Sequence, residues 1–200
     1  VSGKCRDTFT VENTNDSGPG SLRQAILNAN GLPGTQTIAF NIPGAGVRTI
    51  APLTQLPDIT DPVVIDGYTQ PGASPNTLAV GNDAVLLVEL DGTNAGGDSN
   101  GLVIRSGGST VRGLVINRFP DRGISIQPNG GNFIEGCFVG TDATGTIDLG
   151  NGGVGVLIAS SGNNTVGGAT PAARNVISGN ASNGVRVEGS SNNNRVAGNY

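Results

Sequence analysis

The sequence predicts an all-β protein in which short strands stack on one another as a solenoid. The first observation is a strand pattern whose key apolar position returns after 25, 25, 26, 23 and 38 residues. The residues of this main ladder are Phe40, Ile65, Leu90, Ile116, Val139 and Ile177. The second observation is a pair of further apolar ladders with similar spacing. The third is that no helical pattern separates the strands, so the repeats must pack directly against each other.

Each repeat contains three short strands with alternating apolar residues, separated by Gly, Asn and Ser. The second ladder consists of Val85, Val111, Ile134, Val166 and Val196. The third is a Gly-apolar-x-apolar motif that begins at Gly101, Gly123, Gly155 and Gly184. Parallel strands about 4.8 Å apart would close such repeats into a three-sided solenoid. A β-sandwich also has many short strands, but it does not explain the regular spacing.

The alternation within the main ladder assigns residues to the inside and the outside. Ile116 is expected to face inward between Leu90 and Val139, so aspartate at this position should unfold several coils together. Val115 is expected to face outward, so aspartate there should be mild. Asn residues at the first inward position should hydrogen-bond neighbouring coils at a corner. This column reads Ile38, Val63, Val88, Leu114, Cys137, Asn175 and Asn199.

The N-terminal segment predicts a short capping helix over about residues 21–30. Ser21 is suited to the N-cap, Gln24 to the partner position of a capping box, and Gly31 to a left-handed residue after the helix. One domain is expected over residues 1–200. Residues 1–36 would form the cap and residues 37–200 the stacked coils, without a recognisable cap at the C-terminal end.

The composition excludes several classes of function. The chain has 34 Gly among 200 residues, 11 Lys and Arg, 15 Asp and Glu, and no His. Without His, neither a Ser-His-Asp triad nor a His-ligated metal can form within the chain. The net charge of −4 argues against nucleic acid as a partner. The longest apolar run, Ala84–Val88, is too short for membrane insertion.

A family resemblance lies in the N-terminal segment and the repeats. Residues 8–26 end in Ser-Leu-Arg-Gln-Ala-Ile, and units such as Asn-x-Ile-x-Gly-Asn at 175–180 follow. The chain resembles secreted bacterial right-handed parallel β-helix proteins with an N-terminal cap helix. The resemblance implies a right-handed coil and a secreted or cell-surface location. It implies a non-enzymatic structural or adhesion module, or alternatively a polysaccharide-binding or polysaccharide-degrading β-helix, and it transfers no catalytic residue.

Four charged residues are candidates for binding. Arg112 and Glu135 hold equivalent positions on adjacent coils, so we expect either a cross-strand ion pair or a substrate-binding pair. Asp142 and Asp148 lie in an insertion at 141–152 and could supply oxygen ligands to Ca²⁺. The insertion lacks a complete calcium-loop signature, and the alternative is a self-packed loop. No other cofactor and no metal site is expected.

The outward positions of the main ladder predict an apolar stripe, in which Phe138 is a further candidate binding residue. The stripe reads Ala39, Val64, Glu89, Val115, Phe138, Val176 and Tyr200. We expect either that further coils follow in the natural protein or that the chain self-associates through the stripe or the C-terminal edge, unless loops or the helix cover the stripe. Cys137 is expected to be a buried free thiol, because Cys5 lies several coils away.

Overall fold

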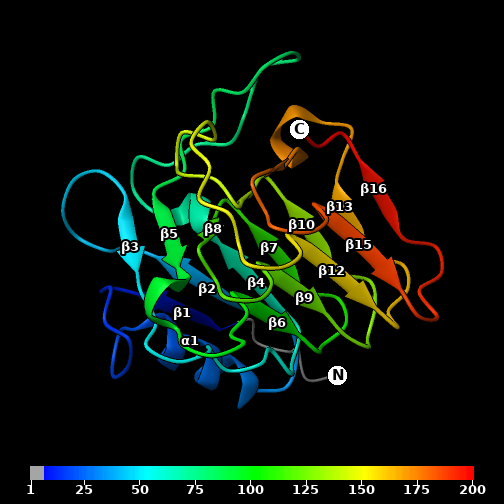
Figure 1. The fold of residues 1–200 in the computed structure, drawn as a ribbon. Helices are drawn as coiled ribbons and strands as arrows, with labels where there is room; N and C mark the ends of the chain where they lie inside the picture. Colours follow the sequence, from blue (N-terminus) through cyan, green and yellow to red (C-terminus); the bar gives the residue numbers. More distant parts are fainter. Residues whose placement is uncertain (1–6) are drawn as a thin grey trace.

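The computed structural model describes residues 7–200 as three parallel β-sheets, one α-helix and short 3-10 turns (Figure 1). Sheet A contains β1 (Thr8–Val11), β2 (Gln36–Phe40), β4 (Val63–Asp66), β7 (Thr110–Arg112), β10 (Phe133–Glu135), β13 (Thr165–Gly167) and β16 (Arg195–Ala197). Sheet B contains β3 (Arg48–Ile50), β5 (Val88–Asp91), β8 (Val115–Asn117), β11 (Phe138–Val139) and β14 (Val176–Ile177). Sheet C contains β6 (Leu102–Ile104), β9 (Ile124–Ile126), β12 (Val156–Ala159) and β15 (Val185–Glu188). The 3-10 turns are η1 (Gly67–Thr69), η2 (Gly92–Asn94) and η3 (Pro171–Ala173).

Successive strands of each sheet come from successive repeats of the chain. In Figure 1, β7, β10, β13 and β16 lie side by side in chain order, and β6, β9, β12 and β15 do the same. Every pairing between named strands is parallel. This stacking has the form of a parallel β-helix-like solenoid, as the strand spacing predicts.

The predicted registers hold over most of the chain. Ile116 pairs with Leu90 on one side and with Val139 on the other, and all three are fully buried. The Gly-apolar-x-apolar motifs form sheet C, where Ile126 pairs with Ile104 and Ile158. The inward columns predicted from these spacings are therefore confirmed.

The start of the main ladder was assigned to the wrong sheet. Ile65 belongs to β4 in sheet A, where it pairs with Ile38 and Val111, whereas Leu90 belongs to β5 in sheet B. Both strands are apolar at their first and third residues and end in Asp, so their sequences cannot be told apart by the inward positions alone. A long connection over residues 70–87 then places the next strand of the other sheet at the same spacing.

Val85 does not belong to the second ladder. It forms an isolated antiparallel bridge with Ser74, and its side chain is 43% exposed. Ile65 takes the position predicted for Val85, next to Val111. Val111, Ile134, Val166 and Val196 pair in succession as predicted.

Helix α1 (Leu22–Asn30) covers the N-terminal end of the core. Ser21 is its N-cap, and the hydroxyl accepts a hydrogen bond from the Gln24 N–H at 3.2 Å. The Gln24 side chain donates to Asn28 instead of completing a capping box. Gly31 has φ −82°, so the left-handed residue predicted after the helix is wrong, and the backbone continues the right-handed turn by donating to the Asn28 carbonyl.

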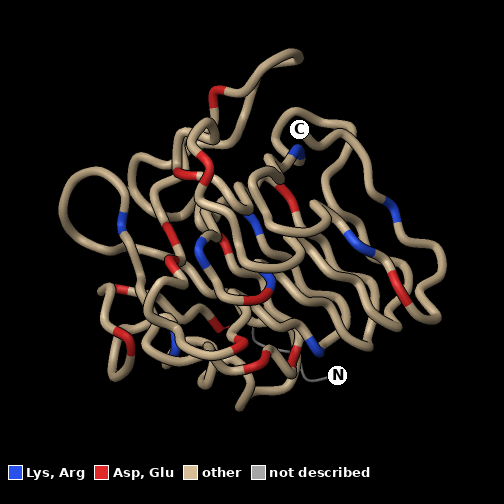
Figure 2. The backbone as a smooth tube through the Cα atoms, viewed as in Figure 1, with Lys and Arg blue, Asp and Glu red and all other residues tan. Residues whose placement is uncertain are grey.

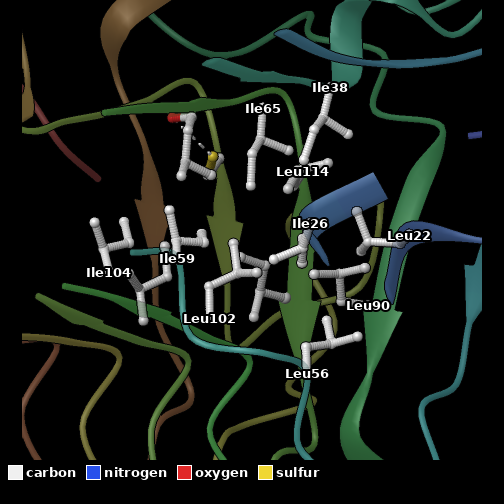
Figure 3. Packing of buried hydrophobic residues seen from close by; sticks show 14 of the residues in the cluster. Leu22, Ile26, Ile38, Leu56, Ile59, Ile65, Leu90, Leu102, Ile104 and Leu114 are labelled. Atoms are coloured by element: carbon white, nitrogen blue, oxygen red, sulfur yellow. Dashed lines mark hydrogen bonds between the residues drawn. The ribbon is translucent and has the colours of Figure 1, made fainter. Parts of the chain in front are cut away.

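One apolar cluster extends from the helix through the coils. Figure 3 shows Leu22 and Ile26 of α1 among residues of the first coils, including Leu56 and Leu90. Both helix residues are buried, as are Ala25 and Ala29 on the same face. The helix therefore keeps water from the apolar residues of the first coils.

The stripe on the outside of sheet B is covered. Val115, Phe138 and Val176 are buried in a second apolar cluster with Leu86. Residues Tyr68, Ala84 and Ala143 from neighbouring loops pack against this cluster. The alternative of covering loops therefore holds for Val115, Phe138 and Val176, and the burial of Val115 removes the basis for expecting aspartate there to be mild. Val115 faces away from the solenoid, but the loops exclude water from it.

Candidate functional site

A column of three charged residues lies on the outer face of sheet A. Asp66 on β4, Arg112 on β7 and Glu135 on β10 stand in register on adjacent strands. Each follows a buried residue of the inward column, so strand alternation turns its side chain outward. The predicted pairing of Arg112 with Glu135 on adjacent strands is confirmed.

Arg112 binds the carboxylate of Asp66 more closely than that of Glu135. Its Nη2 lies 2.7 Å from Asp66 Oδ2, whereas its Nη1 lies 3.9 Å from Glu135 Oε1. The hydrogen bond to Asp66 raises the pKa of the Arg112 guanidinium, against the lowering effect of burial, so the group remains a cation. Asp66 was not among the predicted site residues, because the repeat spacing places β4 in register with β5. The sequence does contain a signal: Asp66 ends strand β4, and β4 pairs with the strand of Arg112.

Tyr68 connects this column to the next coils. It lies in η1, where the Asp66 carboxylate accepts a hydrogen bond from the Tyr68 N–H at 3.1 Å. The Tyr68 hydroxyl donates to the Gly136 carbonyl at 2.9 Å, across two strands. Burial raises the pKa of the phenol well above its ordinary value, with a further contribution from nearby negative groups. Tyr68 is therefore a neutral structural link and is not available as a base.

Two glycines allow the tyrosine to lie against the sheet. Gly113 and Gly136 have φ of 70° and 60°, in the left-handed region that favours glycine. A Cβ at Gly113 would lie 3.0 Å from the ring of Tyr68. A Cβ at Gly136 would be closer still to the Tyr68 hydroxyl. The close approach of Tyr68 thus requires glycine after Arg112 and after Glu135.

Two loops turn this surface into a groove of about 330 Å³. Pro75 contributes from the connection after η1, and Thr170, Ala172 and Ala173 contribute from the turn around η3. The Gly136 N–H donates to the Ala173 carbonyl at 3.3 Å and attaches this turn to the sheet. We call this site the Arg112 groove, lined by Tyr68, Pro75, Arg112, Glu135, Thr170, Ala172 and Ala173.

The chemistry of the Arg112 groove suits binding better than hydrolysis. The Arg112 and Glu135 side chains are 42% and 30% exposed, so they can exchange hydrogen bonds with hydroxyl or carboxyl groups. The Asp66 side chain is 11% exposed, and its oxygens accept from Arg112 and Tyr68. Glycoside hydrolysis by two carboxylates needs a second acid that faces the substrate. Asp66 is engaged in structural contacts, so Glu135 alone faces the groove as an acid.

The remaining predicted residues lie over sheet B, and Tyr68 of the groove packs against the cluster that contains Phe138. Phe138 is 2% exposed beneath Gly145, so it packs within the protein. Thr141 and Asp148 form an antiparallel bridge that closes the loop between them. Asp148 accepts from the Gly150 N–H within the same loop. The structure therefore separates these residues from Arg112 and Glu135.

The Asp142 carboxylate is occupied by its own loop. It accepts hydrogen bonds from the Thr144 hydroxyl and from the N–H groups of Thr146 and Ile147. Desolvation raises the pKa of Asp142, but these hydrogen bonds outweigh it and lower the pKa below its usual value. Within residues 7–200, no group of three or more Cys, Asp or Glu side chains is arranged to hold a metal ion. These contacts are those of a self-packed loop, the alternative to a calcium site at residues 141–152.

Cys137 is buried inside the solenoid as a free thiol. Burial raises its pKa to about 12, so the thiol is protonated at neutral pH and unreactive. Its backbone N–H donates to the Asn175 side chain at 2.8 Å, as the corner column predicts. The prediction about Cys5 lies outside the described residues.

No family model matches this chain, and no curated protein matches it.

Within the described residues, the one α-helix has nine residues, and no helix has the length and apolar character needed to cross a membrane. Figure 2 shows acidic and basic residues interspersed along the coils.

Proposed function

We propose that this chain is a secreted or cell-surface structural module of the adhesion type, without catalytic activity, built as a right-handed three-sided parallel β-helix. One observation supports this role above the others: side chains at the corners tie each coil to the next. The Asn132 N–H donates to the Asn164 side chain, and the Asn164 N–H donates to the Asn194 side chain. Buried amide ladders of this kind satisfy polar groups at the turns and stiffen the stack.

Limited proteolysis combined with a polysaccharide panel tests the structural role. We expect thermolysin to cut first in the projecting loop around Val80, which is 89% exposed, and to leave the stacked coils intact. We also expect no release of reducing ends or unsaturated uronic acids from any polymer, with or without Ca²⁺. Early cleavage within the strands would contradict a rigid module, and turnover of a polymer would contradict the absence of catalysis.

The Arg112 groove supports a second candidate function, the binding of a polysaccharide. The groove places a guanidinium, a carboxylate and an aromatic ring beside one another on an open face. This combination is suited to sugar hydroxyl and carboxyl groups. The same face would also bring Glu135 to the substrate if the polymer were cleaved.

Binding to a glycan array by two arginine variants tests this second function. We expect Arg112→Ala to abolish retention of the bound glycan and Glu135→Gln to weaken it. Arg105→Ala removes an exposed arginine that pairs with Asp58 outside the groove, so it should bind as the wild type does. Thermal melting of each variant separates lost binding from lost folding. Equal binding by folded Arg112→Ala and Arg105→Ala would exclude the groove as the glycan site.

A further inference from the structure

The Arg112 groove contains one charged group without a close partner, the carboxylate of Glu135. Among residues 7–200 its nearest cation is Arg112, whose Nη1 lies 3.9 Å from Glu135 Oε1, beyond hydrogen-bond distance. The Arg112 guanidinium donates its hydrogen bond to Asp66 instead, at 2.7 Å. Because the Glu135 side chain is 30% exposed and lines the groove, its oxygens can accept hydrogen bonds from a ligand there.

The other acidic side chains on the strands each have a close donor. The carboxylates of Asp66, Asp91 and Glu188 lie 2.7, 2.7 and 2.6 Å from an arginine nitrogen. Glu89 accepts two hydrogen bonds from neighbouring side chains, at 2.7 and 2.9 Å. Glu135 therefore differs from these four acids, because the fold leaves its carboxylate available at the one place where the strand borders a groove.

The charged column beside the groove has one carboxylate in excess. Asp66 and Glu135 are two acids, and Arg112 is the single base between them. The other groove residues are aromatic, apolar or hydroxyl-bearing and carry no charge. Arg174 follows the η3 turn, but its guanidinium donates to the Ala79 carbonyl and the Tyr200 hydroxyl and does not line the groove. The groove therefore favours a ligand with a positive charge.

We propose that the Arg112 groove recognises a polysaccharide of amino sugars, in which a protonated amine of the sugar donates to the carboxylate of Glu135. This inference rests on the polysaccharide binding proposed above and names the substrate class. An ammonium group makes a stronger hydrogen bond to a carboxylate than a neutral hydroxyl does. Arg112 is held by Asp66 and can donate its remaining N–H groups to ring hydroxyls. The groove volume of about 330 Å³ lies at the lower end for ligand pockets, which suits a short stretch of chain.

A polysaccharide of uronic acids is a poorer ligand for this groove. Its carboxylates would approach Arg112, whose charge is already offset by Asp66 at 2.7 Å, and they would be repelled by Glu135. Arg112 Nε has no hydrogen-bond partner among the described residues, but it is buried and so lies out of reach of a ligand in the groove. The charge balance therefore selects an amine over a carboxylate.

Three matched trisaccharides test the proposal: the β-1,4-linked trimers of glucosamine, glucose and glucuronic acid. They share one backbone and differ on each ring only in an amine, a hydroxyl or a carboxylate. Calorimetric titration at pH 5.5, where the sugar amines are protonated, measures the affinity of the full chain for each trimer and for trilysine, the probe for a basic peptide. Glu135→Gln removes the charge and keeps the shape of the side chain. Glu188→Gln is the matched control, because it removes a strand carboxylate that does not line the groove.

We expect the wild type to bind the glucosamine trimer at least about fivefold more tightly than the glucose trimer, and the glucuronic acid trimer most weakly. Glu135→Gln should bring the first two affinities within about twofold, whereas Glu188→Gln should keep the wild-type ratio. Equal binding of the glucosamine and glucose trimers by the wild type, or a preference that survives Glu135→Gln, would overturn the inference and leave polysaccharide binding intact. Binding of no trimer would overturn both. Trilysine binding as tight as that of the glucosamine trimer would overturn the assignment to a sugar.

Discussion

Shortening Ile116 to alanine should destabilise the stacked coils by about 3–5 kcal/mol, the upper part of the range for buried Ile→Ala changes. Ile116 is fully buried between Leu90 and Val139, which pair with it on adjacent strands. A Cβ at Gly101 would lie only 2.6 Å from Ile116 Cγ2, so backbone closely borders this side chain. Hydrogen-bonded strands on both sides limit collapse of the cavity, and the cost therefore stays high.

Urea unfolding followed by circular dichroism measures this loss. Ile147→Ala is the matched control, because Ile147 is 57% exposed in the loop after β11, and the same truncation there should change stability by less than about 0.5 kcal/mol. The dependence of unfolding free energy on urea concentration should be the same for the wild type, Ile116→Ala and Ile147→Ala. Equal losses for the two variants would refute the assignment of Ile116 to the interior and the register built on it.

Three further predictions follow from burial and charge. Val115→Asp should destabilise the protein by at least about 3 kcal/mol, because the covering loops leave no water for the carboxylate. Val80→Asp, at a position that is 89% exposed, should be neutral in the same thermal melt, and similar melting of the two variants would contradict the covered stripe. Cys137 should resist iodoacetamide in the native protein at pH 8 and react only after denaturation, as judged by peptide mass spectrometry, since its pKa is raised to about 12; rapid native labelling would contradict its burial. Asp142 has a pKa lowered in the fold, so its stabilising contribution is complete above the ordinary carboxyl pKa and is lost as the pH falls through the lowered value. The difference in melting temperature between wild type and Asp142→Asn should therefore be larger at pH 7 than at pH 2, and a difference independent of pH would contradict this linkage.

Local patterns predicted much of the fold correctly. The helix at the N-terminus follows from Ser21 as N-cap and from the spacing of Leu22 and Ile26. The corner role of Asn175 follows from its place in the column of Cys137. These features depend on residues that are close in sequence or repeat at a constant interval, so a single chain reveals them.

The candidate site was only half predictable. Arg112 and Glu135 follow from equivalent positions in neighbouring repeats. Asp66 and Tyr68 did not follow, because one repeat interval after β4 the chain forms β5 of sheet B, whereas the neighbour of β4 in sheet A is β7. Phe138 was chosen from an outward position, and the alternation of a strand does not say whether a loop will cover that side.

Local sequence patterns are enough to predict the stacked architecture, the helix at one end and the asparagine corners. Alternating aliphatic residues separated by Gly and Asn turns can bury their apolar face only by stacking coil on coil. Tertiary structure alone decided that Ile65 joins sheet A while Leu90 joins sheet B, and that Val115 is covered. Strands β4 and β5 carry apolar residues at the same inward positions, so these positions do not distinguish the two sheets. Long-range packing makes that choice, because each strand lies in the sheet where its neighbours in space complete both its hydrogen bonds and its burial.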